Sequence, residues 1–171
     1  MKKEAKIILI ISLLIIIFLF FYGNFQGPPE PTDFVKNKTV SNYSTVFFNY
    51  DVLRYPSDVE IIPIEQMNGT VLLGFATDPW NIKFGVIPGN GSFVTRSIEL
   101  ANKDKDSKVI LKTYGNISPM VAFSKNNFIL KPYEKVSIDI FLFSNSTKVG
   151  KYSGEIDVIA KKAIYNFPPI S

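Results

Sequence analysis

The distribution of apolar residues divides the chain into one continuous hydrophobic run and a long remainder with alternating residues. The run extends from Ile7 to Tyr22, and Ser12 is its one polar residue. As a helix, it would span roughly 24 Å at about 1.5 Å per residue, and its flanks bring it close to the roughly 30 Å core of a bilayer. We therefore predict a transmembrane anchor at residues 7–23, preceded by a basic cytoplasmic segment at residues 1–6.

Lysines at positions 2, 3 and 6 precede the run. Because lysines that flank a membrane helix stay on the cytoplasmic side, the rest of the chain is predicted to lie outside the cell membrane. A cleaved signal peptide is the alternative, but its cleavage site requires small residues. The bulky end of the run, Phe18 to Tyr22, favours an uncleaved anchor. A buried helix of a soluble protein is the third interpretation.

Residues 24–43 contain the sequence Gly27-Pro28-Pro29-Glu30-Pro31 and show no apolar periodicity. Proline-rich segments favour an extended, semi-rigid conformation. We interpret this region as a stalk that holds a domain away from the membrane. The alternative is an ordinary disordered linker.

From residue 44 onward the pattern has a period of two, which is typical of β-strands. Residues 44–69 are predicted to form an accessory β segment with strands at 46–53 and 59–64, the second an edge strand because it contains Pro63. Asn68-Gly69 then predicts a tight hairpin into a strand at 70–76.

The following residues supply further short strands at intervals of about ten residues. They are expected at 78–87, 93–102, 108–114, 120–124, 127–130, 135–143 and 152–160. No apolar repeat with the helical period occurs after the anchor. These features predict an all-β fold, an immunoglobulin-like antiparallel β-sandwich with Greek-key connections at residues 70–163, followed by a C-terminal tail at 164–171.

Four segments carry a resemblance to a known family: 84–89 (FGVIPG), 95–102 (TRSIELAN), 128–134 (FILKPYE) and 150–158 (GKYSGEIDV). Together they resemble the immunoglobulin-like modules of the major-sperm-protein and hydin type, which also occur in archaeal and bacterial exported proteins. The resemblance implies a non-catalytic adhesion, scaffold or assembly module. Tyr133 departs from the family pattern, which has glycine in that turn.

Composition narrows the chemistry that is available. Without Lys2, Lys3, Glu4 and Lys6, the chain has 16 basic and 14 acidic residues, so it lacks the basic surface of a nucleic-acid-binding protein. Cysteine is absent, and the fold must rest on its core. Histidine is absent too, which removes the commonest general base and zinc ligand. The predominance of Lys over Arg indicates an AT-rich genome and predicts a prokaryotic source, such as an archaeon.

Six Asn-x-Ser/Thr sequons occur outside the anchor, and we predict glycosylation at some of them. They are Asn37, Asn42, Asn68, Asn90, Asn145 and Asn116. Pro119 follows the last of these sequons closely and makes it the weakest candidate. The alternative is that Asn, Ser and Thr coincide at turns because each favours turns.

Two other candidate binding sites are better explained as ordinary structural features of a β-sandwich. Residues 102–107 place oxygen ligands at alternate positions, but Ser107 and Thr113 stand where a calcium loop has Gly and Glu, so a solvated loop is expected. Trp80, Phe84, Tyr114 and Phe123 are expected in the core rather than on an aromatic binding surface.

Glu155 and Asp157 share one face of a strand, where lysines on the neighbouring strand are the expected partners. A hydrolase using carboxylates is disfavoured, and only a concave pocket with converging Asp or Glu would revive it. No cofactor, metal site or small-molecule substrate is evident.

The predicted function is that of a non-catalytic interaction module, attached to the bilayer through residues 7–23 and bound to another protein of the cell envelope. The alternative is a subunit of a surface appendage or secretion assembly. The tail at 164–171 or the edge at Val59 to Ile64 could supply a strand for pairing with the partner.

Overall fold

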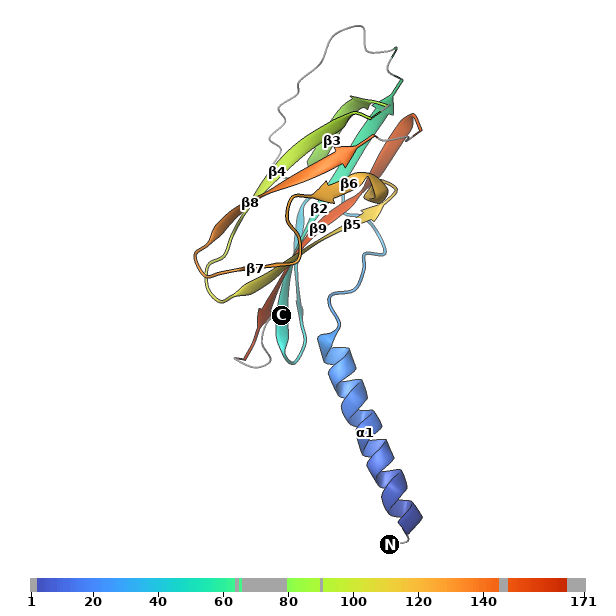
Figure 1. Cartoon of the computed structure of the whole chain (residues 1–171), viewed down its shortest axis with the longest axis vertical. Coiled ribbons are helices and arrows are strands. Elements are labelled where there is room, and N and C mark those ends of the chain that lie inside the picture. Colours follow the sequence, from blue (N-terminus) through green and yellow to red (C-terminus); the bar gives the residue numbers. More distant parts are fainter. Residues whose placement is uncertain (1–2, 64, 66–79, 90, 145–147, 166–171) are drawn as a thin grey trace.

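The computed structural model describes residues 3–63, 65, 80–89, 91–144 and 148–165, and shows a β-sandwich with a helix extending from one end (Figure 1). The predicted strand at 70–76, the Asn68-Gly69 hairpin and most of the C-terminal tail lie outside the described residues. The all-β class of the domain is confirmed.

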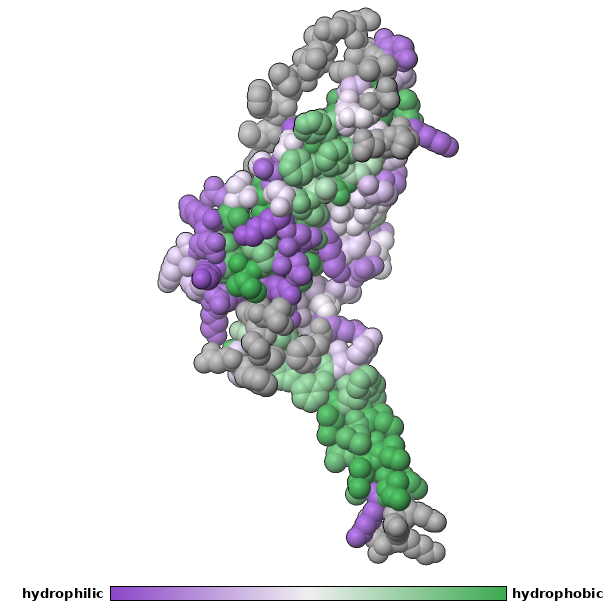
Figure 2. Space-filling model, in the orientation of Figure 1, coloured by the Kyte–Doolittle hydropathy of each residue, from purple (hydrophilic) through white to green (hydrophobic). Residues whose placement is uncertain are grey.

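The helix α1 (Lys3–Phe25) contains the whole hydrophobic run. Its side chains are described for residues 6–22, and every one of them is exposed. Figure 2 shows this helix as a hydrophobic rod that contrasts with the mixed surface of the sandwich.

Within the part of the chain whose placement is described, no helix is long and apolar enough to cross a membrane. The transmembrane helix predicted at residues 7–23 is therefore not confirmed.

The larger sheet has the strand order β1-β2-β9-β5-β7, with β3 beside β2. Its strands are β1 (Thr39–Ser44), β2 (Phe48–Ile62), β3 (Ile82–Pro88), β5 (Ser107–Gly115), β7 (Phe128–Leu130) and β9 (Gly150–Ala163). The smaller sheet has the order β4-β8-β6 and consists of β4 (Phe93–Ala101), β6 (Val121–Phe123) and β8 (Lys135–Phe143). A short 3-10 turn, η2 (Ser118–Met120), precedes β6.

From β3 to β9, every connection crosses from one sheet to the other. As a result, no two consecutive strands of this series pair with each other. Their boundaries lie close to those predicted from the alternation of apolar and polar residues. Asn126 supports this arrangement at the edge of β5. Its side-chain amide accepts the N–H of Leu111 at 2.7 Å and donates to the Leu111 carbonyl at 2.9 Å, as a neighbouring strand would.

Strand β2 corrects the prediction of two strands and an edge at residues 44–69. It is one 15-residue strand at the centre of the larger sheet, paired with β9 from Phe48 to Ile61. On its other side, β1 pairs up to Arg54 and β3 begins at Ser57. Pro56 lies between these two partners, where no strand of the described residues pairs with that side, and a residue without an N–H is tolerated there.

The pairing of β2 with β3 is parallel, whereas the sandwich was predicted to be antiparallel. The register shifts between Asp58 and Val59, because Phe84 is an extra residue between Lys83 and Gly85. Gly85 has a φ of 78°, a left-handed conformation that glycine adopts without a steric penalty. This bulge allows Phe84 to be buried in the core.

Two hydrophobic clusters lie on opposite faces of the larger sheet. The sandwich core, between the sheets, includes Ile61, Phe84, Ile138, Ile140 and Ile156. A smaller outer cluster on the opposite face consists of Phe48, Tyr50, Val52 and Ile159, with Phe47, Ile110 and Ala163 packed against it. In β9, residues 154–159 are all buried, so both faces of this strand are covered.

The predicted stalk is also corrected. Residues 39–44 form β1, and residues 26–38, which we call the strap, lie against the outer face of the larger sheet. On this face, the hydroxyl of Tyr50 donates to the carbonyl of Gln26 at 3.4 Å. The apolar residues of the outer face explain this contact, because the strap removes them from water.

Candidate functional site

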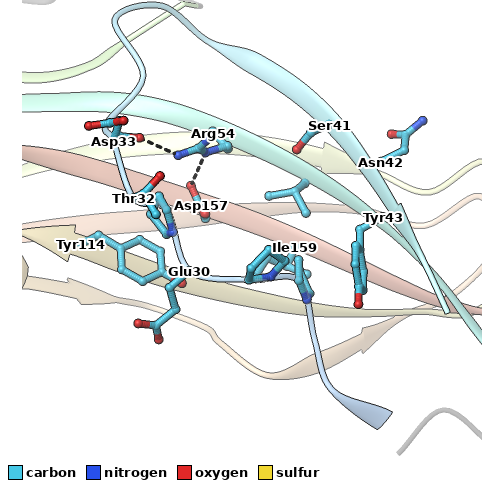
Figure 3. A pocket seen from close by; sticks show the side chains of 14 residues that line it. Glu30, Thr32, Asp33, Ser41, Asn42, Tyr43, Arg54, Tyr114, Asp157 and Ile159 are labelled. Atoms are coloured by element: carbon cyan, nitrogen blue, oxygen red, sulfur yellow. Dashed lines mark hydrogen bonds and ion pairs between the residues drawn. The ribbon is translucent and has the colours of Figure 1, made fainter. Parts of the chain in front are cut away.

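A buried charged cluster lies where the strap crosses β2 and β9, and its members are Arg54, Glu155 and Asp157 (Figure 3). Arg54 donates from Nε to Oε1 of Glu155 at 2.5 Å and from Nη2 to Oε2 at 3.1 Å. Glu155 is fully buried, so this two-point contact supplies the cation that a buried carboxylate requires.

The same cluster holds the strap in place. Nη2 of Arg54 also donates to the carbonyl of Asp33 at 3.0 Å, and the backbone N–H of Val35 donates to Oε2 of Glu155 at 2.8 Å. One carboxylate and one guanidinium therefore connect the strap to two adjacent strands.

Asp157 is the second buried carboxylate, with 4% of its surface exposed. It stands opposite Arg54 on β2 and Lys112 on β5, as the sequence predicted for a charge on this face. Its Oδ1 lies 3.9 Å from Nε of Arg54 and has no hydrogen-bond partner among the described residues. Burial, followed by the hydrogen bond and the charge of Glu155, raises the pKa of Asp157 to about 7.

A cavity of about 500 Å³ lies between the strap and this part of the sheet. Its walls are formed on one side by Pro28, Pro29 and Pro31 and on the other by Val52 and Ile159. In Figure 3, Tyr114 and Tyr43 lie on opposite sides of Ile159, and Asp157 lies beside Arg54. The cavity thus has an apolar part between the prolines and Ile159, and a polar part that includes the buried carboxylate of Asp157.

This arrangement can bind a cation or a proton at Asp157. It does not provide the two available carboxylates that glycoside hydrolysis uses, because Glu155 is occupied by Arg54 and Val35. Among the residues that the structure describes, no group of three or more Asp or Glu side chains could hold a metal ion.

The sequence analysis missed this cavity, although it placed Glu155 and Asp157 on one face of a strand. The missing information was the position of the proline-rich segment, which was interpreted as a stalk. One available signal was the apolar series Phe48, Tyr50 and Val52 on the same face of β2 as Arg54. An apolar series on an outer face indicates that something covers it.

Of the six sequons, the structure describes Asn37, Asn42 and Asn116, and all three are exposed. Asn42 lies on β1, and Oδ1 of Asn116 accepts the backbone N–H of Ser153 at 2.7 Å. The sequons at Asn68, Asn90 and Asn145 lie outside the described residues. Glycosylation stays a prediction for all six.

In the loop at residues 102–107, residues 103–106 are exposed as predicted, whereas Asn102 and Ser107 at its two ends are buried. Nδ2 of Asn102 donates to the carbonyls of Lys105 and Leu130 at 2.7 and 2.9 Å, and its Oδ1 accepts the hydroxyl of Ser107 at 3.3 Å. Asn102 therefore closes the loop as a structural residue.

The four aromatic residues divide between core and surface. Phe84 is buried in the sandwich core, and Phe123 packs against it, as predicted. Tyr114 lines the cavity under the strap, and Trp80 is 62% exposed, so the core prediction is wrong for these two.

Comparisons with known proteins add little to this geometry. No family model matches the chain, so the resemblance to the major-sperm-protein and hydin type is not confirmed. No curated protein matches it either. Among solved structures, the chain is similar to an antigen and type I fimbria protein of Burkholderia pseudomallei, with 11% identity, a TM-score of 0.30, and coverage of 69% of this chain and 99% of that chain. A similarity this low supports no argument about function.

Proposed function

We propose that this protein is a membrane-anchored module of the cell envelope that binds another protein outside the cytoplasm and is not an enzyme. The observation that carries the proposal is α1, whose described side chains are exposed on every side and apolar from Ile7 to Tyr22 apart from Ser12. A helix that is apolar all round is stable only when lipid or protein covers it. The lysines before it favour a cytoplasmic N-terminus.

The junction between α1 and the sandwich supports a short, ordered attachment. The ring of Phe47, in the β1–β2 turn, stacks on Phe21 with a centroid distance of 6.0 Å and meets Phe20 edge-on at 6.1 Å. The strap then leads directly from α1 onto the sheet. In this proposal the sandwich stands close to the bilayer surface.

The edge strand β1 is the surface that best fits a protein partner. It ends the strand order of the larger sheet, and all six of its residues are exposed. The sequence TVSNYS contains no charge and no proline, and its register with β2 is regular. Edge strands are usually protected from pairing by charged residues, by proline or by a bulge. β1 can therefore accept an extended segment of a partner by strand addition.

The attachment to membrane is tested by fractionation of cells that produce the full chain. We expect the protein to stay in the membrane pellet after alkaline carbonate extraction and to keep its N-terminal segment by mass. A variant with Ile11→Lys and Ile15→Lys should be released into the supernatant. Release of the unchanged chain, or a mature protein that lacks residues 1 to about 23, would contradict the proposal.

The partner surface is tested by photo-crosslinking in intact cells. A crosslinking residue at Val40, exposed on β1 and outside the cavity, should capture a specific envelope protein, whereas the same residue at Glu99, exposed on β4 of the other sheet, should not. Capture of a wall or surface-layer protein supports the proposal. Capture of a filament component would instead identify an appendage subunit, and equal capture at both positions would exclude β1 as the binding edge.

A further inference from the structure

The polar groups that line the cavity under the strap are mainly acidic. Glu30, Asp33 and Asp157 line it together with Arg54, whose guanidinium is already bound by the buried Glu155. The surplus of negative charge affects Tyr114 as well. Burial, followed by the charges of Asp157, Glu30 and Glu155, raises the pKa of this phenol to about 12. The cavity therefore favours a positively charged group over a neutral or negative one.

Asp157 supplies the specific contact point. Its carboxylate is more than nine-tenths buried and lines the cavity, and its Oδ1 has no hydrogen-bond donor among the described residues. A buried acceptor is costly until a donor reaches it. Arg54 balances the charge of one buried carboxylate, so the second requires another cation or a proton.

We propose that this cavity binds a primary ammonium group on an unbranched alkyl chain, with the ammonium beside the carboxylate of Asp157 that lines it. The chain lies between Ile159 and the prolines of the strap, whose apolar surfaces suit methylene groups. An ammonium group is compact and carries three donors, so it suits a carboxylate that shares its surroundings with the larger guanidinium of Arg54. A free alkylamine and a lysine side chain of a partner protein share this chemistry.

Binding of the cation competes with protonation of the same carboxylate. The charged groups around Asp157 are Arg54 on β2, Glu155 on β9, Lys112 on β5 and Glu30 on the strap. Because the pKa of Asp157 lies at about 7, the carboxylate is mostly protonated at pH 6 and mostly ionised at pH 8. An ammonium ligand should therefore bind about tenfold more tightly at pH 8 than at pH 6 and release a proton.

The test uses the full chain in detergent micelles and n-butylammonium chloride as the probe, at constant ionic strength. Binding is followed by NMR through the methyl groups of Ile159. We expect saturable shifts and a dissociation constant at least about tenfold higher in the Asp157→Asn variant. Asp58→Asn, which removes an exposed carboxylate from β2 outside the cavity, is the matched control and should bind as the wild type does.

A second probe distinguishes the two sources. The blocked peptide Gly-Lys-Gly should bind more tightly than n-butylammonium if the natural ligand is a lysine of a partner, and more weakly if it is a free amine. An absence of saturable shifts in the wild type, or equal binding by the wild type and Asp157→Asn, would overturn the proposal. The result does not depend on α1, so failure here is distinguishable from failure of the membrane and β1 experiments.

Discussion

The two ends of the long β2–β9 pair bury opposite faces. Toward Ile61, the inward side chains Tyr55, Val59 and Ile61 enter the sandwich core, as in an ordinary sandwich. Toward Phe48, the buried side chains are on the outer face, and the strap lies there in place of a second sheet. The charged cluster of Arg54, Glu155 and Asp157 stands at the change of face.

The difference between these regions shows that one pair of strands can contribute to the sandwich core at one end and to the outer cluster under the strap at the other. The sandwich core is large and closed by two sheets, whereas the outer cluster is small and closed by a segment with little secondary structure. Such segments open at lower free energy than central strands do. The outer end is therefore the region where the connection to α1 can change without unfolding of the sandwich.

The largest effect is expected from Arg54→Met, which removes the cation from the boundary between the two regions. A buried carboxylate without its partner costs about 3–5 kcal/mol of unfolding free energy, to be measured by urea denaturation at pH 7. The control is Lys135→Met, which breaks an exposed ion pair with Glu99 and should change stability by less than about 1 kcal/mol. Similar losses of unfolding free energy in both variants would show that the buried ion pair of Arg54 stabilises the protein no more than an exposed ion pair does.

Truncation of neighbouring β9 residues compares the two regions directly. Ile156→Ala should cost about 4 kcal/mol, because the side chain is fully buried between two sheets that cannot close around the cavity. Ile159→Ala should cost about 2 kcal/mol, because the strap can move toward the space that remains. Thermal and urea unfolding of both variants measure the difference. Equal costs would mean that the outer cluster is packed as rigidly as the sandwich core.

The pH dependence of stability should come from the outer end. The pKa of Asp157 is raised from 3.8 to about 7 in the folded state, mainly by burial. Its contribution to stability is therefore complete below about pH 4 and is lost as the pH rises through 7. Asp157→Asn should abolish this loss and make the protein about 1–3 kcal/mol more stable than wild type at pH 8. If the difference in unfolding free energy between the wild type and Asp157→Asn stays constant between pH 4 and pH 8, the raised pKa of Asp157 is contradicted.

The smallest effect is expected in the turn before β8, in the sandwich region. Tyr133 has a φ of 62°, a left-handed conformation that costs a non-glycine residue about 1 kcal/mol, and its side chain is 84% exposed. Tyr133→Gly should raise the melting temperature slightly and leave the strap unchanged. A loss of stability would mean that the exposed ring has contacts that outweigh the strain.

Local pattern gave good predictions where strands alternate clearly. The boundaries of β8 match the predicted 135–143, and β4, β5 and β7 differ from prediction by one or two residues. It failed in β2, where Pro56 and the polar residues around it suggested a break between two strands. The partners on each side of Pro56 decide that it lies within one strand, and these partners are distant in sequence. The cavity was missed for the same reason, because it depends on contacts between residues 28–33 and β9.

The sequence by itself determined the apolar helix and the strand periods, because each depends on residues within a few positions of one another. Only the tertiary structure decided that successive strands alternate between sheets, that the proline-rich segment covers the outer face, and that Asp157 is buried beside Glu155. These features depend on which distant segments exclude water from which faces. The burial of a charge, and with it the pKa of Asp157, follows from that packing and not from the local sequence.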